Sequence, residues 1–293
     1  MERRSLTWFL AIAFTFSWIL FVLPTAFHGI DASTRQLLQV GLWALAMWGP
    51  GLGAILATRR VAKEPFSTLH LNTLGARRFY LWALFLPTVL AIAAGVFTVL
   101  LGIAQFDPEF HSIRESLRNV PGAENISPSM GIWVQLALAV LLAPFFHMLF
   151  ALGEELGWRG FLLPRLLPIG QWQAIFITGI VWGIWHAPAV VQGLNYPGYP
   201  VAGILMMIIL CVVLGIILSW LYLNTRSPWT TALAHGAFNA VSGLPSLFLK
   251  PGFNRAFGGT LATFPAWIAM ILFIGWLILS KRLPVRPLAE DAK

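Results

Sequence analysis

The sequence predicts an all-α fold: a polytopic membrane helical bundle of about eight transmembrane helices, forming a single membrane-embedded domain over residues 1–293. Three observations support this class. Hydrophobic residues make up 58% of the chain and charged residues only 10%, which is far from the balance of a soluble domain. The hydrophobic residues are gathered in runs of about 20, the length at which a helix crosses a bilayer. An isolated strand could not satisfy its backbone hydrogen bonds in lipid, so these runs must be helices.

The apolar runs follow one another along the whole chain. They lie near residues 6–24, 37–57, 79–104, 131–153, 172–192, 201–223, 229–248 and 263–280. A short basic segment precedes the first run, as in a secretory signal peptide. Because this run is long and rich in Trp and Phe, we interpret it as the first membrane span.

Basic residues indicate how the spans are oriented. The most basic loop separates the second and third runs and contains Arg59, Arg60, Lys63, Arg77 and Arg78. By the positive-inside rule this loop is cytoplasmic, and an even number of spans then places both the N and C termini in the cytoplasm. The net charge of +8 comes from such short groups, so we expect membrane lipids as partners and no nucleic acid. The predicted location is integral to a membrane, the plasma membrane if the source is bacterial.

Two adjacent carboxylates and an arginine stand out among the apolar residues. Glu155 and Arg159 are four residues apart, so on a helix their side chains can pair. Glu154 points about 100° away and cannot share this pairing equally. A helix-end ion pair that anchors the span would account for one carboxylate but not for both. Gly153 and Gly157 form a small-residue face on the same helix, which allows a neighbouring helix to approach closely.

Other polar side chains occur in three further places within the spans. His186 lies deep in an apolar run, shortly before a proline, and His235 and Asn239 share one helical face. His147 lies about two turns before Glu154 and is interpreted as a core or supporting residue. Each such group costs stability in lipid, so together they predict a shared polar cavity. No aspartate lies in a span and no H-E-x-x-H motif occurs, which argues against an aspartyl protease and a classical-spacing zinc protease.

These residues resemble three motifs of the CPBP family, the CAAX-protease and bacteriocin-processing membrane endopeptidases related to the Rce1-type prenyl-protein protease. The resemblance covers residues 131–248, which we take as the catalytic core. Its motifs are Glu154-Glu155-x-x-x-Arg159, Trp182-x-x-x-His186 and His235-x-x-x-Asn239. Trp182 departs from the phenylalanine that is more common in the family, but it keeps an aromatic ring.

The resemblance implies four catalytic residues. Glu154 is the implied base that activates water, His186 assists it, and His235 with Asn239 holds the oxyanion. The remaining motif residues, which are implied to brace the site, are Glu155, Arg159 and Trp182. General chemistry agrees, because a carboxylate in a low-dielectric cavity is a stronger base than in water, and preorganised donors stabilise a tetrahedral oxyanion.

A metal is the main alternative for the chemistry. Glu154, His186 and His235 form a His₂Glu set, the composition of several hydrolytic zinc sites, and members of the resembled family have been described as both metalloproteases and glutamate proteases. We favour a mechanism without a cofactor, because no two of these residues have the close spacing of a zinc-protease helix. Asn239 is also a poor zinc ligand but a good oxyanion donor.

The residues and the resemblance together predict an intramembrane endopeptidase whose cavity opens to the cytoplasm. It would hydrolyse a peptide bond near the C-terminus of a membrane-associated protein or peptide, of which prenylated CAAX-type proteins are one class. The alternatives are a zinc-dependent protease with the same residues, a non-catalytic immunity factor or scaffold of the same family, and a transporter with a proton relay. A rhomboid-type serine protease is disfavoured, because Ser242 and its candidate base His235 would lie on one helix.

The depth of the motifs in the membrane sets a condition on this prediction. Glu154 falls at the end of its apolar run, whereas His186 would lie deeper if its helix begins at Gln171. A common site therefore requires the helix over 131–153 to continue past Arg159, or the helix over 172–192 to begin outside the bilayer.

Overall fold

The computed structural model describes residues 2–118, 122 and 125–285, and the regular elements within these ranges are helices. No strand occurs in the described residues, where Phe106 and Leu249 form an isolated bridge. The all-α prediction is confirmed. The α-helices are α1 (Glu2–Val22), α2 (Ala32–Ala46), α3 (Gly49–Leu56), α4 (Arg78–Leu100), α5 (His111–Arg118), α6 (Pro128–Ala137), α7 (Ala143–Gly157), α8 (Leu163–Leu166), α9 (Gln171–Trp185), α10 (Ala187–Val191), α11 (Pro200–Thr225), α12 (Pro228–Val241) and α13 (Phe264–Leu279).

Several of these helices have the length and composition of membrane spans, so the chain is an integral membrane protein. Five candidates in the described residues run over Arg3–Ala26, Ala32–Ala62, Arg78–Leu100, Pro128–Ile169 and Pro200–Thr225, and α13 is a shorter apolar helix. α9 and α12 fall within two predicted spans but have only 15 and 14 residues. The total of eight spans therefore stays a prediction. The predicted cytoplasmic termini, Met1 and residues 286–293, lie outside the described residues.

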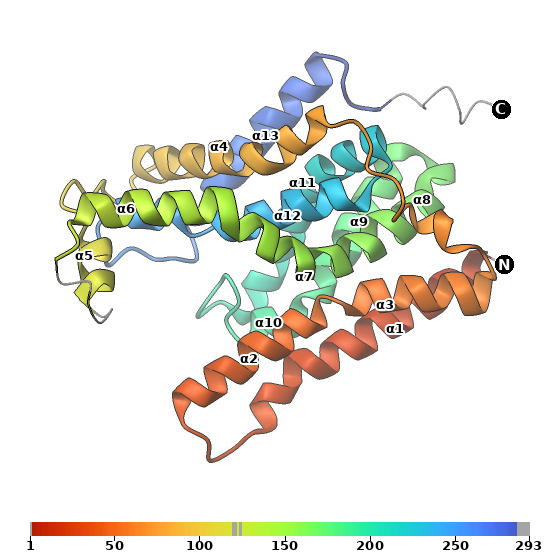
Figure 1. Cartoon of the computed structure of the whole chain (residues 1–293), viewed down its shortest axis with the longest axis horizontal. Coiled ribbons are helices and arrows are strands. Elements are labelled where there is room, and N and C mark those ends of the chain that lie inside the picture. The colour runs from red at the N-terminus through yellow and green to blue at the C-terminus, as the bar shows by residue number, and fades with distance from the viewer. Residues whose placement is uncertain (1, 119–121, 123–124, 286–293) are drawn as a thin grey trace.

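The helices form a bundle with a distinct centre (Figure 1). α1, α2 and α3 lie on one side, α4 and α13 on the opposite side, and α7, α9, α11 and α12 lie between them. α12 packs against both α7 and α4, α11 packs against α9, and α3 joins α1 to α7. The central helices carry the predicted site residues.

The apolar run over residues 131–153 suggested that the helix carrying the two adjacent glutamates ends near residue 153. The helix instead continues beyond it. One helical stretch continues from Pro128 to Ile169, through the π-helical turns η4 (Leu138–Leu142) and η5 (Trp158–Leu162). The apolar run ends at two carboxylates, but an acid and a base on neighbouring turns compensate each other, so the backbone remains helical. This continuation past Arg159 is one of the two alternatives that would allow the three motifs to share one site.

The small-residue face of α7 forms a close helix crossing, as the sequence predicted. A Cβ atom on Gly153 would lie 2.7 Å from the Met47 carbonyl oxygen, and one on Gly157 would lie 2.7 Å from the Pro50 carbonyl oxygen. Glycine is required at both positions because the opposing atoms belong to the backbone. The crossing holds α3 against the helix segment that precedes and includes the glutamates.

Gly236 forms a second close crossing, next to the candidate site residue His235. A Cβ atom on Gly236 would lie 2.6 Å from the Met148 amide nitrogen and 2.7 Å from the Pro144 carbonyl oxygen of α7. We expect Gly236→Ala to lower the free energy of unfolding by about 1–3 kcal/mol, because α12 would be pushed away from α7. Thermal unfolding of the purified protein in detergent measures this loss.

Gly275 in α13 provides a matched control. A Cβ atom there would have no neighbour within 4 Å. Gly275→Ala should therefore leave the melting temperature unchanged or raise it slightly, because alanine favours the helix by about 1 kcal/mol over glycine. Equal losses in the two variants would contradict the role assigned to the Gly236 crossing.

Candidate active site

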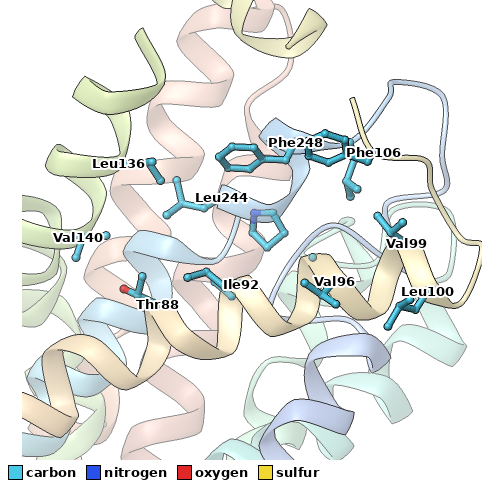
Figure 2. Close-up of a pocket in the computed structure, with 14 residues that line it drawn as sticks. Thr88, Ile92, Val96, Val99, Leu100, Phe106, Leu136, Val140, Leu244 and Phe248 are labelled. Carbon is cyan, nitrogen blue, oxygen red and sulfur yellow. The ribbon is translucent and has the colours of Figure 1, made fainter. Parts of the chain in front are cut away.

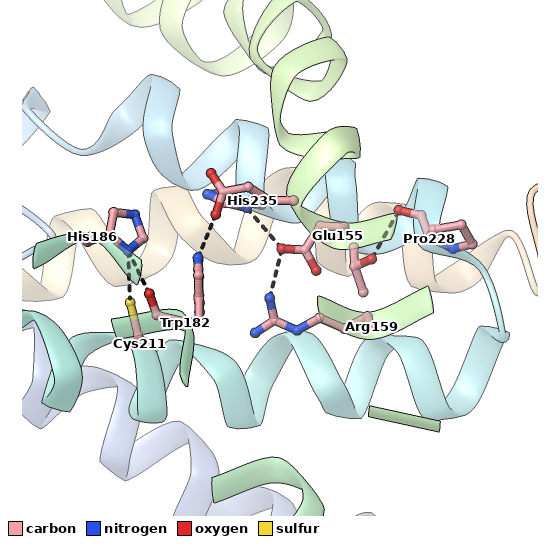
Figure 3. Close-up of polar contacts among 9 residues, drawn as sticks. Glu155, Arg159, Trp182, His186, Cys211, Pro228 and His235 are labelled. Atoms are coloured by element: carbon pink, nitrogen blue, oxygen red, sulfur yellow. Dashed lines mark hydrogen bonds and ion pairs between the residues drawn. The ribbon is translucent and has the colours of Figure 1, made fainter. Parts of the chain in front are cut away.

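Glu155 and Arg159 form an ion pair in the protein interior. The distance from Arg159 Nη1 to Glu155 Oε1 is 2.8 Å, and both side chains are 0% exposed. His235 Nδ1 lies 2.9 Å from the same carboxylate oxygen. Figure 3 shows Glu155 between Arg159 and His235. The pairing expected from the four-residue spacing is confirmed, and it joins α7 and η5 to α12.

Glu154 contacts a different partner. Its Oε2 atom accepts a hydrogen bond of 2.5 Å from the indole Nε1–H of Trp182, and the residue is 1% exposed. Among the described residues, no cation forms an ion pair with Glu154. One of the two adjacent carboxylates therefore forms an ion pair, and the other accepts a hydrogen bond from a neutral donor.

The Trp182 side chain contacts both Glu154 and the ion pair of Glu155 and Arg159. The guanidinium carbon of Arg159 lies 4.5 Å from the centre of its ring, in a cation–π contact. The ring of His235 packs edge-on against it at a centroid distance of 5.3 Å. The face of the indole thus covers Arg159 while its N–H edge points to Glu154. The sequence predicted a bracing aromatic here but not this hydrogen bond.

His186 lies where the helix breaks between α9 and α10. Its Nδ1 atom is 3.0 Å from the carbonyl oxygen of Trp182. A carbonyl oxygen can only accept, so Nδ1 carries the hydrogen and a neutral ring has its lone pair on Nε2. His186 as a whole residue is partly exposed.

Sequence reasoning missed Cys211 as a neighbour of the site. Its sulfur atom lies 3.8 Å from His186 Nδ1, and the side chain is buried. No signal in the sequence could have found it, because a single cysteine in an apolar run has the pattern of an ordinary core residue.

The two remaining polar residues predicted within the spans, His147 and Asn239, lie on the central helices α7 and α12. His147 lies on α7 and is partly exposed. Asn239 lies one turn after His235 on α12 and is partly exposed. In the described part of the chain, no hydrogen bond joins Asn239 to the network, so its amide is free to donate. The predicted site residues that the structure joins are Glu154, Glu155, Arg159, Trp182, His186 and His235.

The residues considered for zinc are not arranged as a ligand set. Among the described residues, no three His, Cys, Asp or Glu side chains are grouped so that they could hold a metal ion. Glu154 is bonded to Trp182, and the Nδ1 atoms of both candidate histidines already have partners. We therefore derive no reaction step through zinc, and a mechanism without a cofactor stays a prediction.

An apolar cavity lies apart from this network, beside the same central helices. Its volume is about 650 Å³. Figure 2 shows Ile92 and Val96 of α4 on one side, Leu136 and Val140 on another, and Leu244 and Phe248 between them. The residues that line it come from segments before α7 in the chain, including α4 and α6, and from the segment that follows α12. None of the predicted site residues lines it.

Comparison with protein families identifies the central part of the chain. Residues 129–241 match the family described as Type II CAAX prenyl endopeptidase Rce1-like. The chain carries an Rce1-like domain. This domain extends from α6 to α12 and contains all three motifs and the whole buried network. The Rce1-like family is a family of membrane proteases, in agreement with the resemblance carried by the motifs. No curated protein matches the chain in a sequence search.

Proposed function

We propose that this protein is an intramembrane endopeptidase that hydrolyses a peptide bond near the C-terminus of a membrane-associated protein or peptide. The observation that carries the proposal is the difference between the two adjacent carboxylates. Glu155 is bonded to both Arg159 and His235, whereas Glu154 is bonded only to a neutral indole N–H. A buried carboxylate without an ion-pair partner is costly for the fold, and it is a stronger base than a carboxylate in water. Activation of water requires such a base.

In the proposed reaction Glu154 removes a proton from water, and the water oxygen attacks the carbonyl carbon of the substrate. The Nε2 lone pair of His186 accepts the second hydrogen of this water and orients it. Glu154 then transfers its proton to the amine that leaves. The hydrogen bond from Trp182 holds Oε2 of Glu154 in place, so the other carboxylate oxygen, Oε1, accepts and donates the proton.

The oxyanion of the tetrahedral intermediate is stabilised by His235 and Asn239. Glu155 accepts from Nδ1 of His235, which leaves Nε2 to face the substrate. To donate to the oxyanion from Nε2 as well, the ring must carry a hydrogen on both nitrogens. The amide of Asn239 supplies a neutral donor. One such donor contributes roughly 3–4 kcal/mol to transition-state stabilisation.

The position of the cavity and of the basic loop supports the proposed substrate class. An apolar space of about 650 Å³ beside the same helices can bury an isoprenoid or acyl chain. The helix from Pro128 to Ile169 brings the glutamates toward the side that the positive-inside rule assigns to the cytoplasm. The active site of the proposed protease therefore opens to the cytoplasm.

We expect the purified protein to cleave a prenylated C-terminal peptide and to keep this activity after exhaustive chelation. The reason is that the proposed base and oxyanion donors need no metal ion. Mass spectrometry of the products measures cleavage, and elemental analysis of the chelated protein measures residual zinc. A known zinc peptidase treated in parallel shows that chelation is effective.

Three other outcomes would contradict parts of this proposal. Loss of cleavage on chelation, with recovery at one zinc ion per protein, would show a zinc-dependent protease. Equal cleavage of a peptide without its prenyl group would remove the lipid chain from the definition of the substrate. No cleavage of either peptide by a folded protein would favour a non-catalytic factor.

A further inference from the structure

A second pocket lies at the ends of three helices, away from the glutamates. Its volume is about 470 Å³. It is formed where α4 begins and where α11 and α13 end, and the polar residues that line it are Arg78, Asn224, Lys281 and Arg282. None of the residues of the candidate active site contributes to it.

Three cationic side chains meet in this pocket. Arg78, Lys281 and Arg282 are exposed, and in the described part of the chain none of them forms an ion pair with a carboxylate. Like charges that share one pocket repel each other unless an anion lies between them. The pocket therefore has the charge of an anion-binding site.

The two cations that follow α13 lie on a fixed turn. Lys281 has a left-handed backbone with φ of 57°, and the amide of Arg282 donates to the carbonyl oxygen of Leu277 at 2.8 Å. Further along, Gln171 bonds both the amide and the carbonyl of Val285, at 2.8 and 3.0 Å. The turn is thus attached to two helices, so the backbone that carries the two cations is held in place before a ligand arrives.

Aromatic rings form the wall next to these charges. Trp82 packs against Trp220 and Trp276, each at a centroid distance of 5.9 Å, and the guanidinium of Arg282 lies 4.6 Å from the ring centre of Trp276. Tryptophan at the ends of membrane helices marks the level of lipid headgroups. Asn224 donates one N–H to the carbonyl of Trp220, which leaves its oxygen and its second N–H for a ligand.

We propose that this pocket binds the phosphate headgroup of an anionic phospholipid. The three cations match the phosphate, Asn224 matches headgroup hydroxyls, and the tryptophan wall continues into the apolar helix surfaces along which acyl chains lie. A free phosphate ion would use the charges but not this wall. The proposal does not depend on the proposed protease activity.

Native mass spectrometry of the full-length protein in detergent tests this site. We expect one phosphatidylglycerol to be retained per protein, and phosphatidylcholine with the same acyl chains to be lost. The triple variant Arg78→Gln/Lys281→Gln/Arg282→Gln should bind phosphatidylglycerol roughly a hundredfold more weakly, because each removed charge near the surface is worth about fivefold in affinity. Glycerol 3-phosphate and inorganic phosphate are titrated in parallel to test for a site for free phosphate.

A second triple variant controls for general charge attraction. Arg59→Gln/Arg60→Gln/Lys63→Gln also removes two arginines and one lysine, but from the basic loop. This variant should keep wild-type affinity. An equal loss in this variant, equal retention of phosphatidylcholine, or equal affinity for soluble phosphate would each overturn the proposal. If the pocket triple variant does not fold, the exposed single substitution Lys281→Glu should still weaken binding by roughly tenfold or more.

Discussion

Replacing Glu154 with glutamine should lower the rate of peptide cleavage by roughly a thousandfold while the protein stays folded. Glutamine has nearly the same shape, and its carbonyl oxygen can still accept the indole N–H of Trp182, which is bonded to Glu154 at 2.5 Å. It cannot remove a proton from water. Its stability should equal or exceed that of the wild type, because a buried carboxylate without a cation is removed. The rate on a prenylated peptide and the melting temperature measure the two effects.

The neighbouring carboxylate supplies the matched control. Glu155→Gln is the same change one residue further along, but it leaves the buried Arg159 and His235 without their shared anion. This variant should lose stability, whereas Glu154→Gln should lose activity alone. Wild-type activity in Glu154→Gln would refute the role of Glu154 as the base. Unfolding of Glu154→Gln would instead show that the carboxylate is structural.

Replacing Arg159 with methionine should lower the free energy of unfolding by about 3–5 kcal/mol. The Glu155 carboxylate, 0% exposed, would lose the cation that lies 2.8 Å away. The contact of the guanidinium with the Trp182 ring would be lost as well. Adding Glu155→Gln should restore most of the stability, because the uncompensated buried charge is then removed. Unfolding of both single variants and the double variant in detergent gives the coupling energy.

Arg165 is a control on the same helical stretch. It also pairs with a glutamate, Glu64, and lies over an aromatic ring, that of Phe161, but the Glu64 side chain is 39% exposed. Because water can solvate Glu64 when its partner is removed, Arg165→Met should cost only about 1 kcal/mol. Similar losses for the two arginines, or strictly additive effects of Arg159→Met and Glu155→Gln, would contradict a buried, coupled ion pair.

The parts of the fold that depend on local pattern could be predicted from the sequence. Apolar runs gave the helical segments, and the four-residue spacing gave the pair of Glu155 and Arg159. The end of the helix that carries them was placed too early, because a count of apolar residues treats charges as a stop. Such a count does not include the pairing of an acid with a base on the adjacent turn, which cancels their charges and lets the helix continue.

The parts that depend on contacts between distant segments could not be predicted from pattern alone. Spacing within one helix says nothing of whether His235 reaches Glu155, 80 residues earlier, and only the resemblance to a family brought the motifs together. The hydrogen bond from Trp182 to Glu154 and the approach of Cys211 to His186 were not predicted at all. Tryptophan and cysteine are ordinary residues of apolar helices, so neither gives a signal of its own.

The indole of Trp182 limits where protons can travel in the proposed reaction. It donates to Glu154 at 2.5 Å and covers Arg159, but its nitrogen has no lone pair to accept a proton, so it cannot serve as a relay. No chain of exchangeable hydrogens through this ring links Glu154 to the ion pair behind it. In the proposed reaction, the proton that Glu154 takes from water therefore does not pass through Trp182 and leaves on the amine product. Each turnover then returns the carboxylate to its starting charge without drawing on the rest of the protein.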